Sequence, residues 1–240
     1  MLKNNAPKRL QVECGECGSL SPACFPGAAA QAGADAQNLC TQMIGPLHKG
    51  AHLFRAGAVS DDIYIVQSGC FKIYAIDPAG RESINGFRFP GAILGLHGLA
   101  RGTHRFNAIA LMTSSVCKIN IHRFTASVTQ MPELYTELLR IIGQELISNL
   151  YLSGNLTAEE RVACFLLTHA DKLQITDDRT ELNLPMSRSD IATYLRLTLP
   201  TVSRVVSRFK AKGLLEADYH HIHILDYDSL KQLCKDVVFD

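Results

Sequence analysis

Residues 187–212 read Ser-Arg-Ser-Asp-Ile-Ala-Thr-Tyr-Leu-Arg-Leu-Thr-Leu-Pro-Thr-Val-Ser-Arg-Val-Val-Ser-Arg-Phe-Lys-Ala-Lys, and they predict two short helices joined by a tight turn. Ser187 is a suitable N-cap for the first helix, with Asp190 in its first turn. Thr198 can cap the second helix. Pro200 lies in the first turn of that helix, where the missing N–H costs no hydrogen bond.

The second helix, residues 199–212, has one apolar and one polar face. The apolar positions follow the spacing i, i+3, i+4 and i+7: Val202, Val205, Val206 and Phe209. Arg204 points outward and can give two parallel hydrogen bonds to O6 and N7 of a guanine, while Ser203 can touch a neighbouring base or phosphate. This is the helix-turn-helix arrangement, in which the second helix enters the major groove of DNA. The candidate DNA-contacting residues are Ser187, Arg188, Pro200, Thr201, Ser203, Arg204 and Arg208.

Charge is distributed unevenly, although the whole chain carries a net charge of only +1. The segment 191–215 contains basic residues and no acidic one, namely Arg196, Arg204, Arg208, Lys210 and Lys212. A local basic face fits a DNA-contacting element, and a solvated helix face is the alternative on charge alone. The segment 220–225, rich in histidine and isoleucine, can form the strands of a wing behind the second helix.

A long amphipathic helix is predicted over residues 132–152, which contain no glycine except Gly143 and no further proline. Apolar and amide side chains recur there at three- and four-residue spacing, at Leu139, Ile142, Leu146 and Asn149. Such a stripe is typical of a coiled-coil-like seam with a partner helix, and packing on the chain's own domain is the alternative. Thr157 and Glu160 then form a capping-box pattern that begins the next helix, so we expect a domain boundary at 153–155.

Short strands are predicted between residues 47 and 121. The segments 62–66 and 70–76 are rich in β-branched and aromatic residues, and tight turns follow both. Further segments at 81–89, 106–111 and 115–121 continue at similar spacing. Regular short strands of this kind favour a doubled antiparallel sheet such as a jelly roll.

Composition and cysteine use point to a globular chain, with 47% hydrophobic and 20% charged residues. No run of eighteen apolar residues or secretory signal is present, so we expect a cytoplasmic protein with no membrane segment. Disulfides are then not expected for the eight cysteines. Cys70, Cys164 and Cys234 sit among apolar residues as core residues, whereas Cys14, Cys17 and Cys24 crowd one Gly/Pro/Ser-rich segment, which needs a chemical reason.

The motif Asp-Ile-Ala-x-Tyr-Leu at 190–195, followed by Thr-Val-Ser-Arg-Val at 201–205, resembles the helix-turn-helix signature of the CRP/FNR family. The segments 68–72, 91–95 and 158–163 are also similar to the FNR branch, so the resemblance covers nearly the whole chain. It implies an α+β fold with an N-terminal double-stranded β-helix of the cyclic-nucleotide-binding type, a long dimerisation helix and a C-terminal winged helix-turn-helix. The implied divisions are a cysteine-rich segment at 1–27, a sensory β-roll at 28–125, the dimerisation helix at 126–154 and the DNA-binding domain at 155–240.

The resemblance also implies partners and a cofactor. The partners are a second copy of the chain, an inverted-repeat site in double-stranded DNA, and RNA polymerase. Four cysteines match the family's ligands for an iron–sulfur cluster, expected to be of the 4Fe–4S type: Cys14, Cys17, Cys24 and Cys117. A tetrahedral zinc site or a metal-free redox thiol pair could use the same residues.

Two departures from the family pattern have consequences. Pro200 stands where FNR proteins usually carry a glutamate that can accept a hydrogen bond from cytosine N4, so selectivity at that base pair should be relaxed. Arg196 replaces the usual turn glycine and is expected to adopt a left-handed backbone conformation, at a cost of about 1–2 kcal/mol.

Other ligands of this superfamily fit less well. Cyclic AMP is not expected, because the glutamate and serine that hold it are replaced by Leu96 and Phe106. His97, His104 and His122 could in principle ligate haem, although each is more readily explained as a packed or surface histidine. The leading hypothesis is a non-enzymatic transcription regulator that senses oxygen or redox state through the cluster. The alternatives are a regulator of the same fold sensing nitric oxide through haem or responding through zinc or thiol chemistry, and an iron–sulfur electron carrier, which would need no basic recognition helix.

Overall fold

The structure is a computed structural model of the chain, and it describes residues 9–10, 42–130, 132–153, 156–173 and 180–234. The chain divides into two compact units, residues 1–143 and 144–240. The division falls within α3, the long helix Pro132–Ser153.

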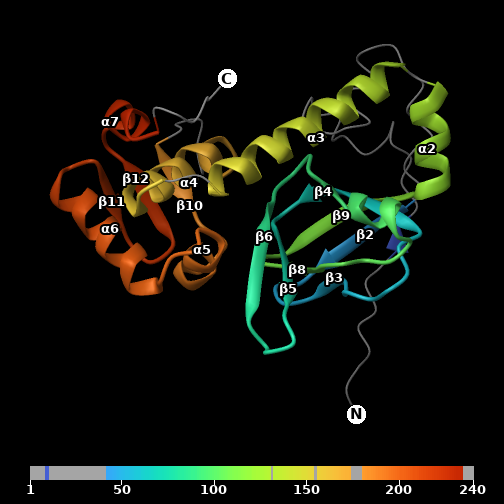
Figure 1. Cartoon of the computed structure of the whole chain (residues 1–240), viewed down its shortest axis with the longest axis horizontal. Helices are drawn as coiled ribbons and strands as arrows, with labels where there is room; N and C mark the ends of the chain where they lie inside the picture. The colour runs from blue at the N-terminus through green and yellow to red at the C-terminus, as the bar shows by residue number, and fades with distance from the viewer. Residues whose placement is uncertain (1–8, 11–41, 131, 154–155, 174–179, 235–240) are drawn as a thin grey trace. The chain divides into compact units, whose positions relative to one another are not determined.

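The first unit is built from two antiparallel sheets (Figure 1). One sheet has the order β1-β2-β9-β4-β7, formed by Arg9–Leu10, Gln42–Leu47, Ser114–Asn120, Asp62–Ser68 and Ile93–Leu94. The other has the order β3-β8-β5-β6, formed by His52–Phe54, Asn107–Ala110, Phe71–Ile76 and Glu82–Arg88. Apart from β1–β2 and the hairpin β5–β6, neighbours in these sheets are not consecutive along the chain. This is the double-stranded β-helix that the short-strand pattern and the resemblance predict.

The interior of the roll is filled by one face of each sheet. Val66 of β4, Phe71 of β5 and Val116 of β9 belong to one apolar cluster, and all three are almost completely buried. Because successive side chains of a strand point to opposite faces, Ile65 and Cys117 point out of the roll. The five-stranded sheet therefore needs a second apolar layer on its outer side.

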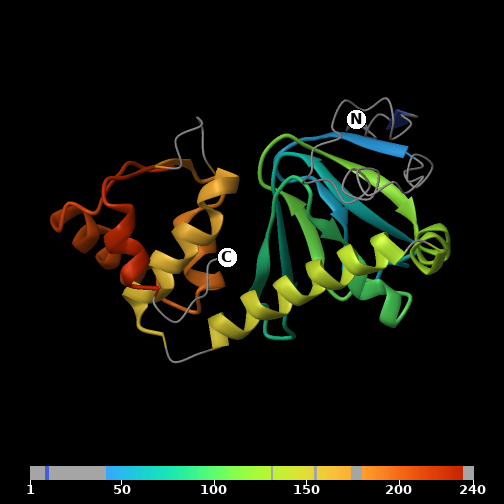
Figure 2. The same ribbon diagram turned by 90° about the horizontal axis from the view of Figure 1, so that it is seen from above.

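Two helices supply that layer. Phe124 of α2 (Ile121–Gln130) and Leu134 of α3 lie in one cluster with Ile63, Ile65 and Cys117. Figures 1 and 2 show both helices beside the sheet that contains β4 and β9. The Cys117 side chain is therefore buried on the outer face of β9, where α2 and α3 cover it.

One strand was not anticipated. No strand is predicted in the cysteine-rich segment 1–27, but Arg9–Leu10 pairs antiparallel with β2, with Leu10 opposite Met43. A two-residue strand is too short to show alternation of polar and apolar residues, so its sequence carries no signal. Strand pairing at the edge of the sheet supplies the hydrogen bonds that fix it.

In the part that the structure describes, the second unit contains the end of α3, four further helices and a three-stranded sheet. The helices are α4 (Ala158–Leu173), α5 (Arg188–Tyr194), α6 (Leu199–Ala211) and α7 (Tyr227–Gln232). The sheet has the order β10-β12-β11, from Glu181–Asn183, His221–Ile224 and Leu215–Ala217. Strand β12 lies within the segment 220–225 predicted for the wing, and its hairpin partner β11 precedes that segment.

The predicted caps of these helices are confirmed. The Ser187 hydroxyl accepts from Asp190 N–H in a complete capping box, and the Thr198 hydroxyl accepts from Thr201 N–H. Thr157 and Glu160 exchange the reciprocal hydrogen bonds of a second capping box at the start of α4. Helix boundaries in this unit therefore follow from local side-chain chemistry.

The turn between α5 and α6 is closed by a Schellman motif. Leu197 N–H donates to Ala192 O, and Arg196 N–H donates to Thr193 O. Arg196 has a φ of 56°, and it is the non-glycine residue with positive φ among those that the structure describes. The left-handed conformation expected from the sequence is confirmed.

We expect Arg196→Gly to stabilise the second unit. Removing the Cβ clash recovers about 1–2 kcal/mol, while the extra freedom of glycine in the unfolded chain takes back about 0.4–1 kcal/mol. Urea unfolding of the full chain should therefore show a net gain of about 0.5–1 kcal/mol for the transition of this unit. Arg196→Ala is the control, because it removes the guanidinium but keeps the strained Cβ. Equal stability of the two variants would contradict the strain.

Candidate functional site

The outer face of α6 presents the candidate DNA-reading residues. Val202, Val205 and Phe209 are buried against the rest of the unit, so the opposite side of the helix faces solvent. Ser203 is half-buried and Arg204 is exposed. The Arg204 side chain forms no hydrogen bond or ion pair with any residue that the structure describes, which leaves its guanidinium available to an acceptor outside the chain.

The other basic side chains of α6 are engaged within the unit. The Arg208 guanidinium lies 2.8 Å from the Glu159 carboxylate of α4, and Lys212 lies 3.4 Å from the same carboxylate. Lys210 donates to the Ala217 carbonyl of β11 at 3.1 Å. The basic face predicted from charge alone is therefore partly neutralised, a feature that depends on a contact between distant helices.

The remaining candidate residues have mixed roles. The Ser187 hydroxyl is held by Asp190 at 2.7 Å, and the Thr201 hydroxyl lies 2.8 Å from that of Thr198. Both hydroxyls therefore serve helix capping. Arg188 opens α5 and is half-buried, and Pro200 is exposed in the first turn of α6. The structure brings Pro200, Thr201, Ser203 and Arg204 together on the first turns of α6.

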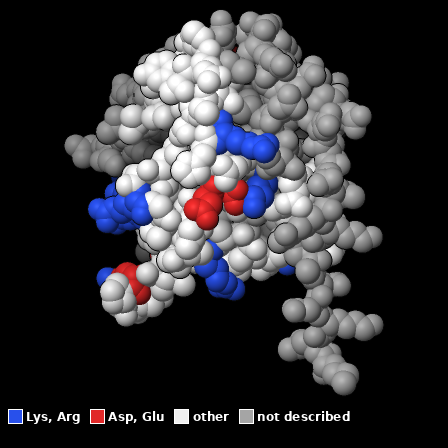
Figure 3. Space-filling model, turned by 90° about the vertical axis from the view of Figure 1, so that its right-hand side faces the viewer, with Lys and Arg blue, Asp and Glu red and all other residues white. Residues whose placement is uncertain are grey.

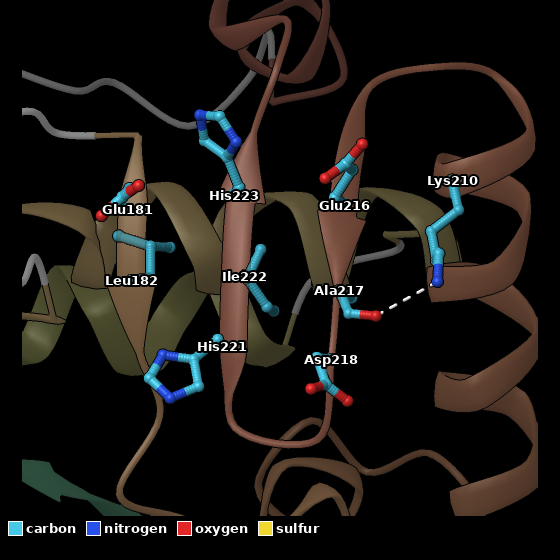
Figure 4. A pocket seen from close by; sticks show the side chains of 9 residues that line it. All are labelled: Glu181, Leu182, Lys210, Glu216, Ala217, Asp218, His221, Ile222 and His223. Carbon is cyan, nitrogen blue, oxygen red and sulfur yellow. Dashed lines mark hydrogen bonds between the residues drawn. The ribbon is translucent and has the colours of Figure 1, made fainter.

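A groove on the wing sheet carries the opposite charge. Its lining is Glu181, Leu182, Lys210, Glu216, Ala217, Asp218, His221, Ile222 and His223 (Figure 4). His223 lies in register between Glu181 and Glu216 of the two flanking strands. Three carboxylates against one lysine make this groove a poor surface for phosphates. This acidic face was not predicted, although the alternation of histidine with isoleucine in β12 and the single glutamate in each flanking strand are readable in the sequence.

The first unit offers less to nucleic acid on the face drawn in Figure 3. This view looks on the side of the molecule where α2 lies in Figure 1. Lys and Arg side chains of the described residues are scattered there, and Asp and Glu side chains lie among them. The exposed arginine of α6 in the second unit is therefore the stronger candidate for DNA contact.

Of the four candidate ligands, one lies within the described residues. Cys117 of β9 is a free thiol and is 7% exposed. Cys14, Cys17 and Cys24 lie outside the described residues. Within the described residues, no group of three or more His, Cys, Asp or Glu side chains could hold a metal ion.

The sheet register nevertheless connects Cys117 with the chain that leads to the other three cysteines. Met43 of β2 lies opposite Leu10 of β1 on one side and opposite Cys117 on the other. Adjacent strands are about 4.8 Å apart, so Leu10 is about 10 Å from Cys117 along this row. Cys14 is four positions after Leu10, and four steps along an extended chain can span up to about 13–14 Å. Cys14 is therefore within chain reach of Cys117.

His97 and His104, two of the histidines considered for haem, pair with each other. His104 Nδ1 lies 3.3 Å from His97 Nε2, and the His104 ring stacks on Phe54 with centroids 3.8 Å apart. Burial, together with the neighbouring His97, lowers the pKa of His104 to about 4. These contacts explain both rings as packed histidines. His122 is exposed on α2.

The region compared with cyclic-nucleotide receptors is also occupied by aromatic packing. The His97 ring contacts the edge of Phe106 at a centroid distance of 5.2 Å. Leu96 begins the 3-10 helix η1 (Leu96–Ala100) directly after Gly95, where those receptors place their glutamate. No observation in this region favours a cyclic nucleotide.

Helix α3 carries two apolar stripes. Leu134, Leu138 and Ile141 pack on the outer layer of the sheet. Leu139 and Ile142 of the predicted seam are 50% and 38% exposed, Leu146 is 60% exposed, and Tyr135 beside them is 53% exposed. Packing on the chain's own unit therefore accounts for one stripe, while the other stripe faces solvent and its pairing with a partner helix stays a prediction. Asn149 lies in α3, but its side chain is outside the described set.

Two protein families match the two parts of the chain. Residues 45–130 match the cyclic nucleotide-binding domain, and residues 160–233 match the Crp-like helix-turn-helix domain. No helix among the described residues is long and apolar enough to cross a membrane.

Similar proteins cover almost the whole chain. It is 36% identical over 220 residues to the transcriptional activator protein Anr of Pseudomonas protegens, covering 90% of each chain. It is 32% identical over 226 residues to the fumarate and nitrate reduction regulatory protein of Escherichia coli, covering 92% of this chain and 90% of that one. Among solved structures, FixK2 from Bradyrhizobium japonicum matches with a TM-score of 0.69 at 29% identity, covering 78% of this chain and 94% of FixK2.

We expect Glu159→Gln to raise affinity for DNA, because it releases Arg208 and Lys212 from a carboxylate. An exposed pair of this kind is worth at most about 1 kcal/mol, so the gain should be about two- to fivefold. Fluorescence anisotropy with one duplex at one salt concentration would measure it. Glu216→Gln in the acidic groove is the control, since it changes the net charge equally without releasing Arg208. An equal gain in both variants would show that only net charge matters.

Proposed function

Because this chain belongs to the CRP/FNR family of transcriptional regulators, we propose that it activates transcription in response to oxygen through an iron–sulfur cluster. The observation that carries the proposal is the row Leu10–Met43–Cys117, which joins the cysteine-rich N-terminal segment to the fourth cysteine. The whole-length similarity to Anr and to the fumarate and nitrate reduction regulatory protein supports it.

The second unit is a winged helix-turn-helix that binds DNA by placing α6 in the major groove. Arg204 binds a guanine, and Ser203 contacts a neighbouring base or phosphate. The nearby sugar-phosphate backbone of the DNA is contacted by Ser187, Arg188, Thr201 and Arg208. Arg208 must exchange its Glu159 partner for a phosphate when DNA binds. Two copies of the chain bind an inverted repeat, with recognition helices about 34 Å apart. The DNA-bound dimer then contacts RNA polymerase.

Dimerisation uses the exposed stripe of α3. Leu139, Ile142 and Leu146 follow the spacing of a helix-helix seam and are exposed in the single chain. Covering such side chains with a second copy removes apolar surface from water, which favours association. Asn149 extends the same row by one turn.

The donor set fits an iron–sulfur cluster. Thiolates are the ligands that such clusters take, and the candidate set consists of four cysteines: Cys14, Cys17, Cys24 and Cys117. Cys117 lies in an apolar layer, which limits the access of water to its sulfur. When bound, the cluster would supply an iron–sulfur group that reacts with oxygen. Zinc could use the same thiolates but would not respond to oxygen by itself.

Cys117 packs in the same buried cluster as the start of α3, the proposed dimerisation helix. Cys117 and Leu134 belong to the same buried cluster, and Leu134 is 0% exposed. Leu138, one turn later, packs on that cluster, and Leu139 beside it belongs to the exposed stripe. Any shift at Cys117 therefore acts on packing at the start of α3, and we infer that cluster loss weakens the dimer.

Cys117→Ser should abolish the brown colour and the anaerobic DNA binding of the chain, because serine is a poor ligand for iron in a cluster. Cys14→Ser, Cys17→Ser and Cys24→Ser should each do the same. Iron and sulfide analysis together with visible spectra of anaerobically purified protein measures the first effect, and a DNA-binding assay measures the second.

Cys70→Ser is the matched control, since Cys70 is a buried thiol of the same unit at 1% exposure. It should keep the colour and the DNA affinity. A Cys117→Ser protein with a full complement of iron and sulfide would rule out the four-ligand assignment.

Arg204→Ala should cost about 1–3 kcal/mol of DNA binding and relax selectivity at one base pair of each half-site. Pro200→Glu should restore an acceptor for cytosine N4 and sharpen the preference for TTGAT, the half-site usual for the FNR branch. Selection of binding sites from random DNA at one fixed salt concentration would compare the parent with both variants.

Half-site spacing should stay unchanged in both variants, because it is set by the dimer and not by α6. If the parent already requires TTGAT as strictly as Pro200→Glu does, then the proline carries no change in specificity.

A further inference from the structure

The first turn of α4 contacts both helices of the helix-turn-helix. Glu159 pairs with Arg208 of α6 at 2.8 Å. Two positions later, the Arg161 guanidinium donates from Nη1 to the carbonyl of Leu195, the C-cap of α5, at 3.2 Å. The contact with α6 changes the charge near the DNA-reading surface, whereas the contact with α5 holds the main chain. Arg161 therefore has a role of its own in this unit.

Arg161 holds a second main-chain carbonyl with the same guanidinium. Its Nε donates to Leu156 O at 3.0 Å, directly before the residue that caps α4. A guanidinium is planar and directs its N–H groups in a fixed fork, so it sets the positions of two acceptors relative to each other. Hydrogen bonds from a charged donor are also stronger than neutral ones. The start of α4 is thereby tied to the end of α5.

The carbonyl of Leu195 belongs to the peptide unit that joins this residue to Arg196. The N–H of the same peptide unit donates to Thr193 O at 3.2 Å, so both of its polar groups are bonded. Directly after this unit, Arg196 takes the left-handed conformation with a φ of 56°. Carbonyls at the C-terminal end of a helix lack partners within the helix. Arg161 supplies a partner at the point where the chain changes direction.

The direction of α6 follows from this turn. Helix α5 ends at Tyr194 and α6 begins at Leu199, so the connection between them is short. A rotation of the peptide unit after Leu195 therefore changes the direction in which α6 leaves the turn. The two parallel hydrogen bonds from Arg204 to a guanine require the guanidinium to lie in the plane of the base edge. A small change in the direction of α6 is enough to weaken them.

We propose that Arg161 is a positioning residue for DNA recognition, which orients α6 by fixing the turn after α5 to the start of α4. The inference rests on the proposed function, since it takes α6 to be the DNA-reading helix. Arg161 is half-buried, and two of its N–H groups are directed at carbonyls of the chain. It acts on the bases through Arg204. Its loss should reduce sequence-specific binding and leave the charge-driven binding to any duplex, which depends on phosphate contacts.

Arg161→Met removes both donors and keeps an unbranched side chain. Fluorescence anisotropy compares the duplex that the parent selects from random DNA with a scrambled duplex of equal length, at one salt concentration. Affinity for the selected duplex should fall about tenfold, the order of one lost base contact. Affinity for the scrambled duplex should change less than about twofold. Lys231→Met is the matched control, because it removes one positive charge from the exposed side of α7 and should keep the parent's ratio of affinities.

A double-mutant cycle separates positioning from general destabilisation. In an Arg204→Ala background, Arg161→Met should have little further effect on the ratio of affinities, because the contact that it orients is already absent. A loss of stability alone would lower both affinities and would add to the effect of Arg204→Ala. Arg161→Lys keeps the charge but lacks the planar fork, so its ratio should lie between those of the parent and Arg161→Met. Urea unfolding of each variant gives the folded fraction used in the comparison.

The proposal is overturned if folded Arg161→Met and Arg161→Lys both keep the parent's ratio of affinities, or if the two losses in the cycle simply add. A parent that prefers no sequence would refute the proposed function and this inference with it. A selective parent with an equally selective Arg161→Met would refute this inference alone.

Discussion

The isoleucines on the outer face of β4 and β9 must be covered, because a side chain of this size costs about 1.5–3 kcal/mol when it stays in water. Phe124 of α2 and Leu134 of α3 cover them. This burial fixes the start of α3 against the strand that carries Cys117. It also turns the opposite stripe of α3, with Leu139 and Ile142, toward solvent. Helix α3 therefore packs on the candidate sensor residue Cys117 with one face and presents the candidate dimer seam on the opposite face.

Positive and negative side chains lie on different surfaces of the second unit. The outer side of α6 presents Arg204, and the groove on the wing sheet presents Glu181, Glu216 and Asp218. Glu159 holds Arg208 and Lys212, so it moderates the positive charge near α6. A surface divided in this way can orient the unit on DNA, because phosphates are attracted to one part and repelled by the other.

Local chemistry explains which parts could be predicted from the sequence. The capping residues Ser187 and Thr198 and the left-handed Arg196 depend on a few neighbouring residues, so their conformations follow from the motif itself. The strands around Val66 and Phe71 follow from alternation and turns. The strand at Leu10 does not, because two residues carry no periodicity and the pairing partner is distant in sequence.

Contacts between distant elements explain what could not be predicted. The pairing of Arg208 with Glu159 joins α6 to α4, and neither sequence segment indicates the other. For the candidate ligands, the resemblance supplies the set of four cysteines, and the register through Met43 adds a physical reason why the first of them can reach Cys117.

The central claim is that a cluster on these cysteines controls the dimer and its binding to DNA. The most direct measurement starts from one anaerobic sample and adds oxygen in steps. At each step, Mössbauer spectra report the cluster, sedimentation reports the dimer fraction, and a binding assay reports the DNA affinity. The account predicts that the cluster signal, the dimer fraction and the DNA affinity fall together. Complete loss of the cluster with unchanged dimer and unchanged DNA affinity would contradict it.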